Sequence, residues 1–223
     1  LAHHATHTAG SPDVTAQALR AAGWIHLFDG RLQEAIEHFD QARAAAHTAG
    51  DTFFELLSEA DIALTRAYNG EDTTAAADEI CARAQTLQAP LLTAYTFYVA
   101  GESRLEHSPQ QALPWLSRAI HLARAAGLRS IAAAAGLSAA SIEVRHGHPQ
   151  TALADLIGLL DDWQHYGVWH HTWLTLRLCI DVFIRLGALE PAAQLIGAVH
   201  ASTTAGSLYG ADADRIARAE ATL

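Results

Sequence analysis

The sequence contains no lysine and no methionine, and only two of its 223 residues are cysteine. All 14 basic residues are therefore arginine, and against 24 acidic residues they leave a formal net charge of −10. A phosphate-binding surface needs clustered basic side chains, and a net negative charge opposes the approach of a nucleic acid. The composition therefore predicts no direct nucleic-acid binding by this chain.

The two cysteines, Cys81 and Cys179, are far apart in the sequence. Both fall within helical patterns, and neither belongs to a CxxC motif. We expect them to be reduced, buried thiols of a cytoplasmic protein.

Long hydrophobic runs are also missing, although half of the residues are hydrophobic. The longest apolar stretch, 131–142, is rich in alanine and shorter than the roughly 20 residues that a membrane-spanning helix needs. No basic, leucine-rich leader precedes the first predicted helix, so we expect neither a membrane span nor a signal peptide. The missing initiator methionine indicates a piece of a longer protein, in which residues 1–12 form a flexible leader.

Glycine and proline recur at intervals of about twenty residues, which is the strongest pattern in the sequence. The positions are Gly30, Gly50, Gly70, Pro90, Pro109, Gly127, Gly147, Gly167 and Gly187. Between them, apolar residues recur every three or four positions, as in amphipathic helices. Glycine often ends a helix in the left-handed conformation, and proline is tolerated in a first helical turn. The pattern predicts an all-α protein.

About five antiparallel helical hairpins are predicted within a repeat domain that spans 13–206. Their bounds are 13–48, 51–88, 91–126, 129–165 and 168–205, and a truncated C-terminal helix is expected within 207–223. A single hairpin cannot bury its faces alone, so successive hairpins are expected to stack into an α-solenoid, a right-handed superhelix. The first helix of each hairpin would line its concave groove.

Segment 19–42, LRAAGWIHLFDGRLQEAIEHFDQA, resembles a tetratricopeptide repeat. The residues that carry the resemblance are Leu19, Ala22, Gly23, Gly30, Ala35, Phe39 and Ala42. In that motif, Gly23 and Ala35 stand where two helices approach too closely for a larger side chain, and Phe39 fills the space beside them. The resemblance implies a similar small residue in each later second helix, at Ala75, Ala112, Ala152 and Ala192.

The later repeats are longer than usual and resemble the C-terminal superhelical domain of MalT/LuxR-type (STAND) signal-transduction ATPases, particularly large actinobacterial regulators. The chain end, 186–223, is similar to the end of those proteins at Pro191, Ala192, Ala193, Leu195, Gly197 and Ala198. The resemblance implies a non-catalytic sensor domain of a larger cytoplasmic transcriptional regulator, without a cofactor. The sequence has no GxxxxGK[ST] loop and no recognisable helix-turn-helix, so ATPase or DNA-reading activity would belong to other parts of that regulator. The alternative is a stand-alone tetratricopeptide adaptor for a protein or peptide.

Superposing the first helices on the tetratricopeptide pattern places one set of residues on the groove. They are Arg20, Trp24, Phe28, Tyr68, Phe97, Arg104, Arg145, Arg177, Asp181 and Arg185. Because arginine recurs there although acids dominate the chain, we expect an acidic protein, peptide or small-molecule partner. Alternatively, these arginines pair with nearby acids and only keep an exposed surface soluble. Self-association is a further open alternative.

The stretch HYGVWHHTW, at 165–173, places three histidines and two tryptophans in nine positions. His170 and His171 are adjacent and point about 100° apart on a helix, whereas a helical metal pair needs a spacing of three or four. We interpret the stretch as an aromatic joint between the last two hairpins, without a metal. Asp161 and Asp162 are interpreted as a solvated helix end rather than a catalytic pair.

Overall fold

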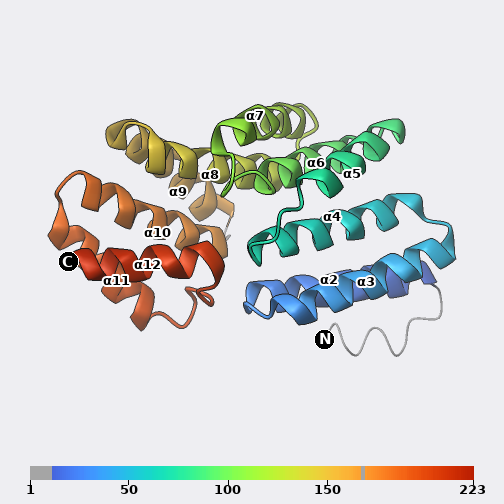
Figure 1. Cartoon of the computed structure of the whole chain (residues 1–223), viewed down its shortest axis with the longest axis horizontal. Helices are drawn as coiled ribbons and strands as arrows, with labels where there is room; N and C mark the ends of the chain where they lie inside the picture. Colours follow the sequence, from blue (N-terminus) through green and yellow to red (C-terminus); the bar gives the residue numbers. More distant parts are fainter. Residues whose placement is uncertain (1–11, 167–168) are drawn as a thin grey trace. The chain divides into compact units, whose positions relative to one another are not determined.

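The computed structural model describes residues 12–166 and 169–223. In these ranges the regular secondary structure is entirely α-helical, and eleven helices follow one another along the chain (Figure 1). The predicted all-α class is confirmed. None of the described helices is long and apolar enough to cross a membrane. The predicted leader, apart from Pro12, and Gly167 lie outside the described residues.

The helices form successive pairs whose bounds follow the predicted hairpins closely. They are α2 (Pro12–Phe28), α3 (Leu32–Ala49), α4 (Thr52–Tyr68), α5 (Thr74–Thr86), α6 (Pro90–Glu102), α7 (Pro109–Ala125), α8 (Arg129–His146), α9 (Pro149–Tyr166), α10 (Trp169–Arg185), α11 (Leu189–Ala201) and α12 (Gly210–Thr222). The largest difference from the predicted hairpin bounds is in α11, which ends at Ala201 and not at 205. It ends early because Ser202 adopts an extended backbone, with φ −85° and ψ 131°.

The chain divides into two compact units, one ending at Ile131 and the other beginning at Ala132. The first holds α2 to α7, and the second holds most of α8 and all of α9 to α12. A single continuous solenoid with a right-handed twist stays a prediction, as does the single repeat domain 13–206.

In the described ranges, the second helix of each pair buries the same pattern, an alanine followed four positions later by a larger residue. The pairs of residues are Ala35 and Phe39, Ala77 and Cys81, Ala112 and Leu116, Ala152 and Leu156, and Ala192 and Ile196. Each of these side chains is at most 8% exposed. One packing pattern thus recurs in α3, α5, α7, α9 and α11, which is consistent with a helical repeat.

The prediction that Ala75 is the small packing residue of the second pair is wrong. Ala75 is exposed, and Ala77 takes the buried place expected for it. The turn 69–73 that leads into α5 is longer than the turn 29–31 that leads into α3, which moves the packing register along the chain.

Gly23 of α2 marks the closest approach of the first helix pair. A Cβ atom added there would lie 2.5 Å from Cε1 of the buried Phe39. In the third pair, Gly101 of α6 has the same relation to α7, because an added Cβ would lie 2.5 Å from Cδ2 of Leu116. The predicted packing role of Gly23 is confirmed, and Gly101 is a counterpart that the sequence pattern did not reveal.

Both cysteines are free and buried, as expected from the sequence. Burial raises the pKa of each thiol to about 11. The thiol of Cys81 also donates a hydrogen bond to the carbonyl of Thr96 at 3.1 Å. Neither thiol therefore forms the thiolate needed for nucleophilic chemistry near neutral pH.

The close approach at Gly101 predicts that a single added methyl group destabilises the first unit. Gly101→Ala should lower the free energy of unfolding by about 1–3 kcal/mol, because Leu116 has to leave its packed position. The matched control is Gly158→Ala in α9, where an added Cβ meets nothing within 4 Å. That change should be neutral or stabilising by about 0.5–1 kcal/mol, since alanine favours a helix over glycine. Urea unfolding measures both, and equal stability of the two variants would contradict the proposed packing.

Candidate functional site

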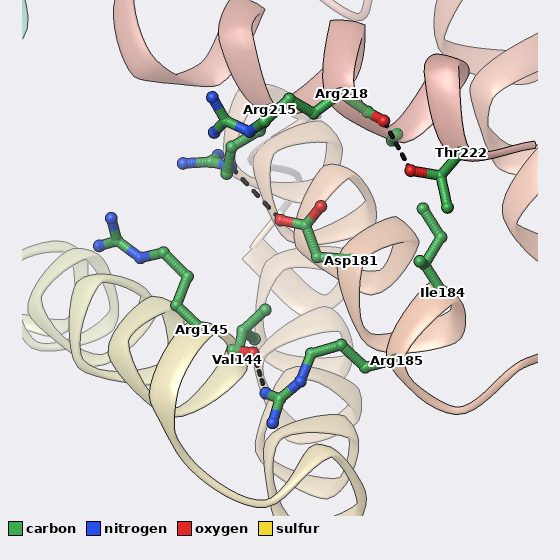
Figure 2. Close-up of a pocket in the computed structure, with 9 residues that line it drawn as sticks. Val144, Arg145, Asp181, Ile184, Arg185, Arg215, Arg218 and Thr222 are labelled. Carbon is green, nitrogen blue, oxygen red and sulfur yellow. Dashed lines mark hydrogen bonds and ion pairs between the residues drawn. The ribbon is translucent and has the colours of Figure 1, made fainter.

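An open pocket of about 280 Å³ lies within the second unit, between α8, α10 and α12 (Figure 2). It is lined by Val144, Arg145, Asp181, Ile184, Arg185, Arg215, Arg218, Ala219 and Thr222. Among these lining residues, four are arginine and one is aspartate, in a chain whose formal charge is −10. The pocket therefore gathers positive charge against the balance of the whole chain.

Helical spacing brings these side chains together. On α10, Asp181, Ile184 and Arg185 follow at intervals of three and four, so they share one face. On α12, Arg215 and Arg218 are three apart and share a face in the same way. A buried cluster holds α12 in place, and its members are Ile180, Ala192, Ile196, Val199, Ile216 and Ala219. The pocket depends on this core, because without it α12 would not face α10.

Arg185 fastens the C-terminal end of α8. Its Nη1 donates to the carbonyl of Val144, and its Nη2 donates to the carbonyl of Gly147 at 2.6 Å. The last carbonyls of a helix have no partner within the helix, and the helix dipole favours a cation beside them. Arg185 therefore positions α8 against α10, and part of its donor capacity is already used.

Two aspartates hold Arg215. Its Nη2 donates to Asp212, and its Nε lies 3.5 Å from Oδ2 of Asp181. Asp212 also accepts a hydrogen bond from Nη1 of Arg177 at 2.6 Å. Burial raises the pKa of Asp181, while the positive charge of Arg215 acts in the opposite direction. The positive charge of Arg215 is therefore balanced within the protein.

Arg177 is 2% exposed and lies beneath the loop that precedes α12. Besides Asp212, its guanidinium donates to the carbonyls of Ala205 and Gly206. Arg177, which was predicted to line the groove, is therefore buried and ties α10 to this loop and to α12.

Arg145 and Arg218 stand on different helices of the pocket. Nε of Arg145 donates to the carbonyl of Ser141, one turn earlier in α8, at 3.2 Å. No carboxylate among the described residues lies within ion-pair distance of the Arg218 guanidinium. In Figure 2 the guanidinium groups of Arg145, Arg215 and Arg218 point to the same side of the pocket, while that of Arg185 points to Val144. Arg145 of α8 and Arg218 of α12 thus line one pocket from two different helices.

A second polar cluster joins α2, α4 and α6 in the first unit. Nε and Nη2 of Arg20 donate to the Asp61 carboxylate at 2.5 and 3.2 Å, and the Tyr95 hydroxyl donates to it at 2.6 Å. Asp61 is 1% exposed, and burial raises the pKa of its carboxyl group while Arg20 opposes that rise. The rings of Trp24 and Tyr95 lie 6.0 Å from the guanidinium. This cluster links the first helices of three successive pairs.

The other predicted groove residues of the first unit have different surroundings. Phe28 is exposed and lies 5.4 Å from the Trp24 ring, and the hydroxyl of Tyr68 lies 3.0 Å from that of Tyr98. Phe97 is 2% exposed and packs edge-on against Trp115 of α7, so it faces its own helix partner. Sequence spacing missed this because α6 is buried continuously from Ala94 to Glu102, so a periodic pattern does not separate a groove face from a packed face.

Arg104, another predicted groove residue, is buried, with only 7% of its surface exposed. Its Nη2 donates to both oxygens of Asp78 at 2.7 Å, and its guanidinium lies 5.0 Å from the Trp115 ring. Arg104 therefore connects α5 with the pair α6 and α7. Pairing with a nearby acid, the alternative given for the groove arginines, is found at Arg104 and also at Arg20 and Arg177.

Of the predicted groove residues, the pocket brings together Arg145, Asp181 and Arg185. Arg215 and Arg218 were missed, because the last helix was treated as separate from the groove. Their spacing of three residues indicates that both side chains lie on one face of a helix, and this pattern could have identified them. A binding role for the ten predicted residues stays a prediction.

The described residues around the stretch 165–173 lie at the contact between α9 and α10. The Trp163 indole donates to Thr175 at 3.0 Å, and His171 stacks on Trp163 at 4.5 Å between ring centroids. Trp173 donates to Thr204 at 3.0 Å. These contacts support the interpretation as a joint. Across the described ranges, no group of three or more histidine, cysteine or acidic residues could hold a metal ion.

Asp161 and Asp162 are both exposed, as expected for a solvated helix end.

No family model matches the chain, and no curated protein matches it either.

The buried histidine of the joint predicts a loss of stability in acid. Burial, with a smaller contribution from His170, lowers the pKa of His171 from 6.5 to about 4. The unfolded chain therefore takes up a proton below about pH 6.5 before the folded chain does, and stability falls as the pH is lowered from 6.5 to 4. Full titration of this group corresponds to roughly 3 kcal/mol.

His171→Phe keeps an aromatic ring against Trp163 but has no titrating group. Its free energy of unfolding should fall by roughly 3 kcal/mol less than that of the unaltered protein between about pH 7 and pH 4. The control is His146→Gln, a change at an exposed histidine. Urea unfolding at both pH values gives the comparison, and an identical acid loss in the His171 variant would contradict the buried, neutral imidazole.

Proposed function

We propose that the chain is a non-catalytic binding module, which serves as the sensor domain of a larger cytoplasmic transcriptional regulator. The observation that carries the proposal is the recurrence of one buried packing pattern in successive helix pairs. Stacked helix pairs present the side chains of their first helices on an extended surface, and proteins of this architecture use that surface to bind partners. The proposed partner is an acidic protein, peptide or small-molecule effector.

The tetratricopeptide resemblance is supported by the way its key residues pack. Gly23, Ala35 and Phe39 meet at a close helix contact, which is the role that the motif gives them. The segment that resembles the end of MalT/LuxR-type regulators includes Pro191, in the first turn of α11, and the buried Ala192. Gly197 of the same motif is exposed, and an added Cβ would meet nothing there.

The distribution of arginine supports an acidic partner. The pocket combines four arginines from α8, α10 and α12, while the chain as a whole is strongly acidic. The net negative charge of the chain opposes the approach of an acidic ligand, whereas the arginines of the pocket attract it, which favours binding there.

The state of the reactive groups supports a binding rather than a catalytic role. The carboxylate of the pocket, Asp181, faces Arg215 at 3.5 Å. Burial raises the pKa of both cysteine thiols to about 11. The buried Asp61 is bound by Arg20 and Tyr95, which leaves its oxygens engaged in structural hydrogen bonds.

An array of short peptides tests the binding role. Acidic peptides and their Asn/Gln counterparts are matched in length, and the full chain is titrated against both. We expect the chain to bind the acidic set, with affinity that falls between about 0.05 and 0.5 M salt because exposed charges are screened. The double variant Arg145→Gln/Arg218→Gln should bind at least about tenfold more weakly, since charge-assisted hydrogen bonds are lost.

The matched control is Arg124→Gln, which removes the same charge from the exposed surface of α7. Equal binding of acidic and neutral peptides, or an equal loss of affinity in the control, would contradict an arginine-dependent site.

The complete gene distinguishes a regulator domain from a stand-alone adaptor. A nucleotide-binding domain with a helix-turn-helix segment supports the regulator, and the absence of both supports the stand-alone adaptor.

A further inference from the structure

We propose that the pocket between α8, α10 and α12 binds a small organic oxyanion, a carboxylate or phosphate group on a short apolar body, and that this ligand fastens α12 to α8. The inference rests on the proposed function and names the ligand class and the regulation of the same site. It follows from the charge, the apolar surface and the helix contacts of the pocket.

The donors of the pocket differ in how far they are already engaged. Arg215 is balanced by Asp181 and Asp212, and Arg185 is bound to carbonyls at the end of α8. Arg218 is exposed and has no carboxylate partner among the described residues, so its whole guanidinium is available for a ligand. A guanidinium offers two parallel donors that match the oxygens of a carboxylate or a phosphate. Arg218 is therefore the primary anchor for an oxyanion.

Arg145 supplies the second side of the site, from α8. Its guanidinium points to the same side of the pocket as that of Arg218 (Figure 2). An oxyanion that accepts hydrogen bonds from both would neutralise part of the positive charge that α8 and α12 bring together. This placement identifies the charged group of the ligand and the two helices that it contacts.

Apolar side chains complete the lining. Ile184 of α10 is partly exposed there, while Val144 and Ala219 are almost fully buried behind the lining. A bare inorganic ion would leave this surface in contact with water, whereas an attached apolar body covers it and gains the corresponding hydrophobic stabilisation. The volume of about 280 Å³ is near the lower end of the roughly 300–1,000 Å³ that is usual for small-molecule sites. That size fits a ring-sized body.

The regulatory part of the inference comes from the contacts of α12. This helix packs on α10 and α11 through Ile216 and Ala219, and Asp212 ties its first turn to Arg177. Arg218 lies further along α12, on the side that faces the pocket. A ligand held by Arg218 and Arg145 therefore adds a link between α12 and α8, and it stabilises the docked position of α12.

Four small probes test the ligand class on the full chain. Benzoate and phenyl phosphate carry the two oxyanions on the same apolar ring, benzamide is the neutral counterpart, and acetate is a carboxylate with almost no apolar body. Titration calorimetry gives affinities, and the Nε–Hε NMR signals of arginine report the site. The Arg218 signal, assigned by its loss in Arg218→Gln, should shift in a saturable way with benzoate or phenyl phosphate.

The pocket inference predicts a clear order of binding. Benzamide should leave the Arg218 signal unchanged, and acetate should bind at least about tenfold more weakly than benzoate, because it lacks the apolar body. The tighter of benzoate and phenyl phosphate identifies the oxyanion. Arg145→Gln and Arg218→Gln should each weaken the better probe by about tenfold or more, while the surface control Arg124→Gln should not change its affinity.

Hydrogen exchange tests the link to α12. With the better probe at ten times its dissociation constant, amides in 213–222 should exchange about tenfold more slowly, since opening of α12 must first release the ligand. Amides in the first unit provide the internal reference. Binding without slower exchange in α12 would overturn the regulatory part of the inference.

The outcomes for this inference and for the proposed function are separable. If benzamide binds as well as benzoate, or if Arg218→Gln has no effect on the better probe, the oxyanion site is overturned. If neither benzoate nor phenyl phosphate binds while acidic peptides still bind through the arginines, the small-ligand inference is wrong and the proposed function stands. If the probes bind as described and the peptides do not, the pocket is supported as a small-molecule site alone.

Discussion

The close contact between paired helices is the constraint on which the rest of the structure depends. Where Gly23 meets Phe39 and where Gly101 meets Leu116, an added Cβ would lie only 2.5 Å from a side-chain carbon. Each second helix in the described ranges places a buried alanine at the equivalent contact. Small residues determine the packing within each pair, so the first helices can differ in their polar residues. Polar residues of first helices take part in the polar clusters of both units.

The arginines of this acidic chain have two roles: some hold helices together, and others are exposed at a pocket. Arg20, Arg104 and Arg177 each pair with an aspartate on another helix, Asp61, Asp78 and Asp212 respectively. In the pairs with Asp61 and Asp212 both partners are mostly buried, and removing one partner of such a pair typically costs about 3–5 kcal/mol, so these arginines belong to the framework. Arg218, in contrast, is exposed at a pocket and has no carboxylate partner among the described residues. The proposed binding role depends on this second kind.

Helix bounds were predictable because local residues determine them. Gly50, for example, ends α3 in the left-handed conformation with φ 69°, as its spacing suggested. The inner register of α5 was not predictable, since the length of one turn decides whether Ala75 or Ala77 is buried. The burial of Arg104 and Arg177 was also missed, because their partners stand on other helices and periodicity along one helix does not reveal them. Arg215 and Arg218 line the site because α12 packs on α10, and the sequence pattern does not show this packing.

We propose that this chain is a binding module with an arginine-lined site for anions. The most direct measurement is a crystal structure of the full chain grown with phenyl phosphate. We expect electron density for the phosphate group within hydrogen-bonding distance, about 2.7–3.2 Å, of the guanidinium groups of Arg145 and Arg218. The phenyl ring should lie against Ile184. A pocket in which Arg218 instead pairs with a carboxylate of the chain, with the ligand bound elsewhere or not at all, would contradict it.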